Sequence, residues 1–236
     1  MAPVPPGGRC ATAGPTRRPA AQSAIYRGRA RYLGGATEHP HHCGSKEHPV
    51  GHGGDVIHEL TTDHREVEDM FAQIEALPSG DSRRKELADK VTIELVRHSV
   101  AEEMYLYPTV REHLPNGDSI ADKELEDHAK AERTMKDLER CQADDPQFDR
   151  LMTELMSEIR DHVADEEGNL FPMMRQTCSA EDLQRLGDKV RTAKKMAPTR
   201  PHPSAPDTPP GNKLLGPGAG MVDRLRDALT GRGKSD

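Results

Sequence analysis

His98-Ser-Val-Ala-Glu102-Glu103-Met-Tyr-Leu106-Tyr107-Pro108 returns 64 residues later as His162-Val-Ala-Asp-Glu166-Glu167-Gly-Asn-Leu170-Phe171-Pro172. A shorter string precedes each copy, again 64 residues apart: Asp63-His64-x-x-x-Glu68 and Asp127-His128-x-x-x-Glu132. The two histidines of each half are separated by 34 residues in both cases. The chain therefore contains a duplicated unit that carries two histidines and several acids.

Apolar residues around these histidines recur at steps of three and four, which is typical of amphipathic helices. The pattern predicts helices over 55–77, from 81 to Pro108, over 120–142, and from Pro146 to about 173. Pro108 is expected to kink or end the second helix, because proline has no N–H for the carbonyl four residues back. Pro115-Asn116-Gly117 predicts a turn. In each helix the histidine lies on the apolar face.

Long helices joined by short loops, with no strand-like alternation between 55 and 195, predict an all-α fold. We expect an antiparallel up-down-up-down four-helix bundle. A fifth helix fits 179–195, and a short amphipathic helix fits 221–229. The predicted organisation is a disordered N-terminal extension over 1–50, a metal-binding bundle over 51–197 and a disordered tail over 198–236 that carries the short helix.

Composition limits the classes of protein that fit. The chain has 236 residues, a formal charge of −7, 33% hydrophobic residues and no Trp. The negative charge argues against nucleic-acid binding, and no apolar run is long enough to cross a membrane. Four cysteines without C-x-x-C spacing and the lack of an apolar leader favour a reduced, cytoplasmic protein.

The first fifty residues leave alternatives open. They are rich in Pro, Gly and Arg and are expected to be disordered, or else translation starts at Val50. Their cluster of metal-ligand residues is a weak metal site or a solvated polar tract; it comprises His39, His41, His42, Cys43 and His48.

In an antiparallel bundle the histidines of the first and third helices lie at equal heights, and those of the second and fourth return to about the same level. Glu102 and Glu166 each follow a histidine by four residues and therefore share its helix face. Burying these groups without partners is costly, and a pair of cations would offset that cost. The sequence predicts a metal site made of His64, His98, Glu102, His128, His162 and Glu166.

Other residues near the site have weaker support. Glu68 and Glu132 lie at the edges of their apolar faces and are either ligands or solvated acids. Tyr105 either donates a hydrogen bond at the site or is part of the core, and His58 and His113 have no repeat partners and are not expected to bind metal. Acids expected to orient the imidazoles are Asp63, Glu103, Asp127 and Glu167.

The order His, H-x-x-x-E, His, H-x-x-x-E, with Leu-Tyr-Pro and Leu-Phe-Pro after the second and fourth elements, resembles a hemerythrin-like HHE cation-binding domain over about 55–175. The resemblance implies a four-helix bundle that holds two non-haem irons per chain, bridged by oxygen, with both glutamates of the predicted set as bridges. Because all predicted ligands are nitrogen or oxygen, Mn or Zn is the alternative to iron.

The chain departs from the oxygen-carrying members of that family. Glu132 stands where they have a further histidine. They have an aspartate five residues after the fourth-helix histidine, whereas Glu166 follows His162 by four residues and Glu167 takes the fifth position. This puts reversible oxygen carriage in doubt and favours binding or reduction of O2, H2O2 or NO in oxidative or nitrosative stress or in iron handling. An enzyme with weak catalase- or peroxidase-like turnover, an iron or redox sensor without turnover, and a purely structural bundle remain alternatives. The sequence does not identify a protein partner.

Overall fold

The computed structural model describes residues 53–209 and 211–233, all of which belong to one compact unit, Glu47–Asp236. The expectations for residues 1–50, including the cluster around His39, lie outside these residues. No described helix is long and apolar enough to cross a membrane.

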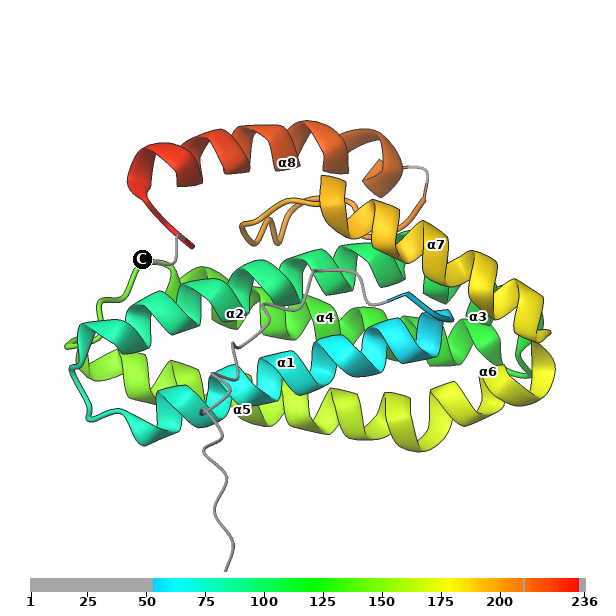
Figure 1. Cartoon of the computed structure of the whole chain (residues 1–236), viewed down its shortest axis with the longest axis horizontal. Helices are drawn as coiled ribbons and strands as arrows, with labels where there is room; N and C mark the ends of the chain where they lie inside the picture. The colour runs from blue at the N-terminus through cyan, green and yellow to red at the C-terminus, as the bar shows by residue number, and fades with distance from the viewer. Residues whose placement is uncertain (1–52, 210, 234–236) are drawn as a thin grey trace, which may run out of the picture. The chain divides into compact units, whose positions relative to one another are not determined.

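Four long helical segments form the bundle, and each runs antiparallel to the segment before it (Figure 1). The first is α1 (Val56–Ala76) and the third is α4 (Gly117–Leu138). The second consists of α2 (Ser82–Ala101), the π-helical turn η1 (Glu102–Leu106) and α3 (Tyr107–His113). The fourth has the same three parts: α5 (Pro146–Asp165), η2 (Glu166–Leu170) and α6 (Phe171–Thr177). The predicted all-α four-helix bundle is confirmed.

Short polar residues begin the helices. The carboxylates of Asp55, Asp81 and Asp145 accept hydrogen bonds from backbone N–H groups two or three residues later. These bonds satisfy N–H groups that have no partner inside the helix. The predicted turn at 115–117 is shorter than expected, because Gly117 already begins α4. A Cβ atom at Gly117 would collide with the carbonyl oxygen of Val110, so glycine is needed there.

The second segment does not end at Pro108, one of the two outcomes expected there, because α3 continues to His113. The fourth segment likewise continues past Pro172 to Thr177. Each passes through a π-turn just before the proline, in which the N–H of Tyr107 or Phe171 bonds to the carbonyl five residues back, at Glu102 or Glu166. The wider turn inserts one extra residue into the helix. The helix then continues through Pro108 and Pro172, although neither proline has an N–H to donate.

Two apolar clusters fill the bundle on either side of its middle. One includes Val67, Phe71 and Leu155, and the other includes Leu60 and Leu106. On α1, His64 lies between Leu60 of one cluster and Val67 of the other. The polar residues of the repeat therefore lie between two layers of packed hydrophobic side chains.

Two further helices follow the bundle. The predicted fifth helix is present as α7 (Ala180–Met196), and it begins at Ser179, whose hydroxyl accepts from the N–H of Asp182 at 3.1 Å. Helix α7 packs on α1 and α2 (Figure 1). Its C-terminal part brings Lys194 to α1, where the side chain is almost fully buried.

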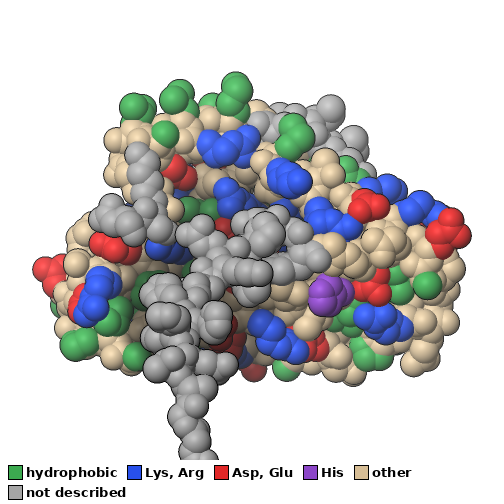
Figure 2. Space-filling model, in the orientation of Figure 1, with side chains coloured by type: hydrophobic (Ala, Val, Ile, Leu, Met, Phe, Trp, Pro, Cys, Tyr) green, Lys and Arg blue, Asp and Glu red, His purple; other side chains and the backbone are tan. Residues whose placement is uncertain are grey.

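The C-terminal region differs from the expected disordered tail. Helix α8 (Gly211–Thr230) is longer than the predicted segment 221–229 and contacts α7. Arg200, in the stretch before α8, is buried and bonds to Glu139, directly after α4, and to Asp227 of α8. The sequence pattern missed these contacts because they are made by isolated charged side chains. Figure 2 shows hydrophobic side chains along the outer face of α8, where Met221, Val222, Leu225 and Leu229 are exposed.

Candidate metal centre

Four imidazoles, one from each long segment, meet in the middle of the bundle. They form two pairs: the ring centroids of His64 and His98 are 5.0 Å apart, and those of His128 and His162 are 4.9 Å apart. Each residue is between 5% and 7% exposed. The antiparallel arrangement thus brings together residues that are far apart in the sequence.

Two fully buried glutamates lie between the pairs. Oε2 of Glu102 is 3.2 Å from Nε2 of His98 and 3.4 Å from Nε2 of His128. Oε2 of Glu166 is 3.4 Å from Nε2 of His64 and 3.5 Å from Nε2 of His162. Each carboxylate therefore contacts one imidazole of each pair, which is the position a bridging ligand needs.

The donor atoms of the described residues fall into three groups that could hold a metal ion. One consists of His64, His98 and Glu166, and a second of Glu102, His128 and His162. The third consists of Glu124, Asp127 and His162, and it shares its imidazole with the second. All six side chains predicted from the sequence are in these groups. Their role as ligands remains a prediction, whereas their convergence is a feature of the structure.

A carboxylate contacts the outer nitrogen, Nδ1, of every imidazole. The distances are 2.9 Å from His64 to Glu167, 3.1 Å from His98 to Asp63, 3.0 Å from His128 to Glu103 and 2.9 Å from His162 to Glu124. At His64, His98 and His128 the contact is a hydrogen bond, which keeps the proton on Nδ1 and leaves Nε2 free to bind a metal. The contact of His162 with Glu124 is close but lacks hydrogen-bond geometry. Every Nε2 atom points towards the two buried glutamates.

The acid closest to His162 is not the one predicted. Asp127 lies in one group with His162 but pairs with Lys123 at 2.9 Å, and Glu124 of the same helix contacts Nδ1 of His162. Glu124 is fully buried. Its position one helical turn before His128 was a usable signal, because residues four apart share a helix face.

Tyr107 takes the place at the site that the sequence suggested for Tyr105. Its hydroxyl lies 2.9 Å from Nε2 of His128, 3.5 Å from Oε2 of Glu102 and 3.4 Å from Oε1 of Glu166. The π-turn η1 explains the shift, because its extra residue places position 107 on the inner face. The equivalent residue of the second repeat, Phe171, stacks on His64 with ring centroids 5.9 Å apart.

Glu68 and Glu132 do not join the site, so the reading of them as ligands is not supported. Glu68 is exposed and pairs with Arg160 at 2.7 Å. Oε1 of Glu132 accepts a hydrogen bond of 2.6 Å from the backbone N–H of His202. His58 and His113 are exposed and belong to none of these groups.

The buried acids change the proton affinity of two of the imidazoles, those of His98 and His128. Burial alone would lower the pKa of His98, but attraction by Glu102 and the hydrogen bond to Asp63 outweigh it and raise the pKa to about 10. Burial likewise opposes the rise in the pKa of His128, which Glu102 and Glu103 bring well above its usual value. For Glu102, burial favours a higher pKa, yet His98 and His128 hold it well below the usual range. The centre therefore attracts positive charge, and a metal must displace protons to bind.

The residues present fit a metal. Nε2 of His64, Oε1 of Glu102 and Oε2 of Glu166 are buried and have no hydrogen-bond partner. Buried polar atoms without partners are costly, and cations at the two positions would offset this cost. Imidazole nitrogen with carboxylate oxygen and no thiolate suits iron, manganese or zinc.

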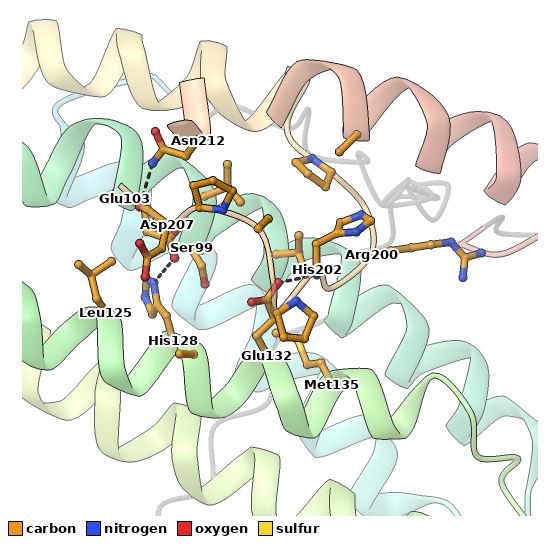
Figure 3. Close-up of a pocket in the computed structure, with 18 residues that line it drawn as sticks. Ser99, Glu103, Leu125, His128, Glu132, Met135, Arg200, His202, Asp207 and Asn212 are labelled. Carbon is orange, nitrogen blue, oxygen red and sulfur yellow. Dashed lines mark hydrogen bonds and ion pairs between the residues drawn. The ribbon is translucent and has the colours of Figure 1, made fainter. Parts of the chain in front are cut away.

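A cavity of about 110 Å³ adjoins the centre, between α2, α4 and the segment before α8 (Figure 3). His128 and Glu103 line one side of it, and His202 and Asp207 line the other. Burial raises the pKa of Glu103. The hydrogen bond to His128 acts in the opposite direction, whereas the negative charges of Glu132 and Asp207 add to the rise. The C-terminal segment therefore forms one wall of the space next to a candidate ligand.

Comparisons with known proteins agree with this geometry. The model of the hemerythrin HHE cation binding domain matches residues 55–174. An uncharacterised hemerythrin-like protein of Schizosaccharomyces pombe is 29% identical over 168 residues, which cover 71% of this chain and 82% of the relative. A DNA nickase of Nostoc is 28% identical over 137 residues, and the match spans 57% of this chain but only 38% of the nickase.

A solved structure shares the fold. The crystal structure of a hemerythrin HHE cation binding domain-containing protein from Mycobacterium kansasii superposes with a TM-score of 0.53 at 18% identity. The superposition covers 60% of this chain and 85% of that one. Since the matched domain contains all six converging side chains and both repeats, the chain belongs to the hemerythrin HHE cation-binding family.

Proposed function

We propose that the protein binds two iron ions between the imidazole pairs and uses them to bind or reduce O2, H2O2 or NO. The observation that carries this proposal is the position of the two glutamates, because each contacts one imidazole of each pair. His64, His98 and Glu166 would hold one ion, and Glu102, His128 and His162 the other. When bound, two irons supply two electrons to a small oxidant.

The surrounding residues suit such chemistry. The centre lies between two apolar clusters and its side chains are buried, which strengthens charge interactions inside it. The hydroxyl of Tyr107 is a proton donor next to both glutamates. The outer acids hold the imidazoles in one orientation as the charge of the centre changes.

Metal analysis of the purified full-length chain tests the binding proposal. We expect about two irons per chain and an oxo-bridge absorption band in the wild type. Glu166→Gln removes the charge of one bridge and should lower the metal content. Glu68→Gln is the matched control, because Glu68 pairs with exposed Arg160 away from the centre. A wild type without stoichiometric metal, or equal metal in both variants, would contradict the proposal.

A second candidate is an iron or redox sensor without turnover. The contact between the backbone of His202 and Glu132, four residues after His128, favours it because the C-terminal segment could respond to the centre. Steady consumption of H2O2 by the iron-loaded protein supports the first function. Metal-dependent hydrogen exchange in 198–233 without consumption supports the sensor.

A further inference from the structure

The buried ammonium group of Lys194 belongs to a helix outside the region that matches the family domain, 55–174. Its Nζ lies 2.5 Å from Oδ1 and 2.8 Å from Oδ2 of Asp63, and 3.0 Å from Oε1 of Glu59. The side chain is 6% exposed. Oδ2 of Asp63 also accepts from Nδ1 of His98 at 3.1 Å. A continuous chain of contacts therefore joins α7 to a candidate metal ligand.

This contact differs from those at the other orienting acids. Arg65 pairs with Glu167 but is 62% exposed, and Lys123 lies 3.5 Å from Glu124 and is 52% exposed. Water and salt weaken interactions of such exposed charges, whereas a buried pair is screened much less. Lys194 is therefore the cation that can hold an orienting acid most firmly among these three.

The internal repeat shows what Lys194 changes. Asp63 corresponds to Asp127 in the second repeat, yet Asp63 hydrogen-bonds to an imidazole whereas Asp127 pairs with Lys123. Lys123 occupies the position equivalent to Glu59 and draws Asp127 away. Helix α7 packs on α1 and α2, in the first repeat, and there Lys194 holds Asp63 against His98.

We infer that Lys194 is a positioning residue for His98: it fixes the carboxylate of Asp63, and that carboxylate fixes the imidazole whose Nε2 faces the metal position. The inference rests on the proposed function, because it concerns affinity for metal. It assigns to α7 a part in building the centre beyond covering the bundle. Partners that orient a ligand in this way typically change metal affinity about 10- to 100-fold when removed.

Calorimetric titration of the metal-free full-length protein with Fe²⁺, without oxygen, tests the inference. We expect Lys194→Met to weaken one of the two binding steps about 10- to 100-fold and to leave the other unchanged. Arg191→Met is the matched control, because Arg191 is on the same helix and pairs with Glu59, whereas Lys194 pairs with both Glu59 and Asp63. It removes the same charge and should not change either step.

A second pair of variants guards against loss of folding. Lys194→Met leaves two buried acids with less compensation, so thermal unfolding followed by circular dichroism is measured in parallel. The double variant Lys194→Met/Glu59→Gln removes one of these acids and keeps the local sum of charges. It should fold and still show the weakened step, because Asp63 still lacks its cation.

A double-mutant cycle separates positioning from a merely structural role. If Lys194 acts through Asp63, Lys194→Met causes no further loss in a protein that already carries Asp63→Asn. The inference is overturned if the two losses add, if Lys194→Met binds Fe²⁺ as the wild type does, or if Arg191→Met loses as much affinity as Lys194→Met. None of these results affects the proposed function, provided that the wild type binds two ions. A wild type that binds no Fe²⁺ would overturn both.

Discussion

The hydroxyl of Tyr107 lies 2.9 Å from Nε2 of His128, on the edge of the imidazole that faces the two buried glutamates. The equivalent residue of the other repeat, Phe171, has no hydroxyl and stacks on His64 instead. The duplicated centre is therefore chemically asymmetric, with a proton donor on one side and an aromatic face on the other. Burial, followed by the charges of Glu102 and Glu166, raises the pKa of Tyr107 well above its usual value, so the phenol keeps its proton.

Tyr107→Phe should keep both metal ions, because the phenol is not among the six predicted ligands. The metal-free protein should lose about 1 kcal/mol of unfolding free energy, the usual contribution of a buried hydrogen bond. Urea unfolding with a chelator present measures the loss, and metal analysis measures the content. A loss of metal would show instead that the phenol is a ligand.

His162→Ala should remove at least one metal ion. The metal-loaded protein should also unfold at a lower temperature, because an ion that binds only the folded state stabilises it by mass action. His113→Ala is the control, since the His113 side chain is 41% exposed and hydrogen-bonds to the carbonyl of Thr109. Equal metal content in the two variants would exclude His162 as a ligand.

Arg200→Met should detach the C-terminal segment from the bundle. Arg200 is buried between Glu139 at 2.9 Å and Asp227 at 2.6 Å, and removing one partner of a buried ion pair typically costs about 3–5 kcal/mol. Amides of α8 should exchange faster, while those of α1 and α5 keep their protection. Arg226→Met, at an exposed position of α8, is the control. Unchanged exchange in α8 would mean that other contacts hold it.

The attachment of the C-terminal segment should depend on pH through His202 and Asp223, which are 2.9 Å apart. The hydrogen bond to Asp223 raises the pKa of His202 above 6.5, with Lys136 opposing and Glu132 supporting the rise. The contribution of protonated His202 is complete below 6.5 and is lost as pH rises through the raised pKa. Burial opposes the fall in the pKa of Asp223 below 3.8, but the hydrogen bond to His202 outweighs burial. The contribution of ionised Asp223 to the attachment is therefore present above pH 3.8 and is lost as pH falls through the lowered pKa.

Attachment by this pair is therefore strongest between about pH 4 and 6.5. Proteolysis of 198–233, with the protease activity calibrated at each pH on an unfolded substrate, measures it. His202→Gln should abolish the alkaline limb of the profile. An identical profile for this variant would assign the pH dependence to other groups.

The sequence by itself determined the bundle and the six converging side chains. A period of three to four residues fixes which side chains share a helix face, and this geometry is local to each helix. It placed Glu102 beside His98 and Glu166 beside His162 without knowledge of their neighbours. The repeat then placed both units at one height, because its two halves have equal spacing.

Tertiary structure alone decided which neighbours support those side chains. Tyr107 replaced Tyr105 because the π-turn shifts the inner face by one residue. Glu124 replaced Asp127 because Lys123 holds Asp127 elsewhere, and Lys194 reached Asp63 because α7 folds back onto α1. Helical periodicity cannot choose between acids a few residues apart on similar faces, because the choice depends on cations that other helices bring within hydrogen-bonding distance.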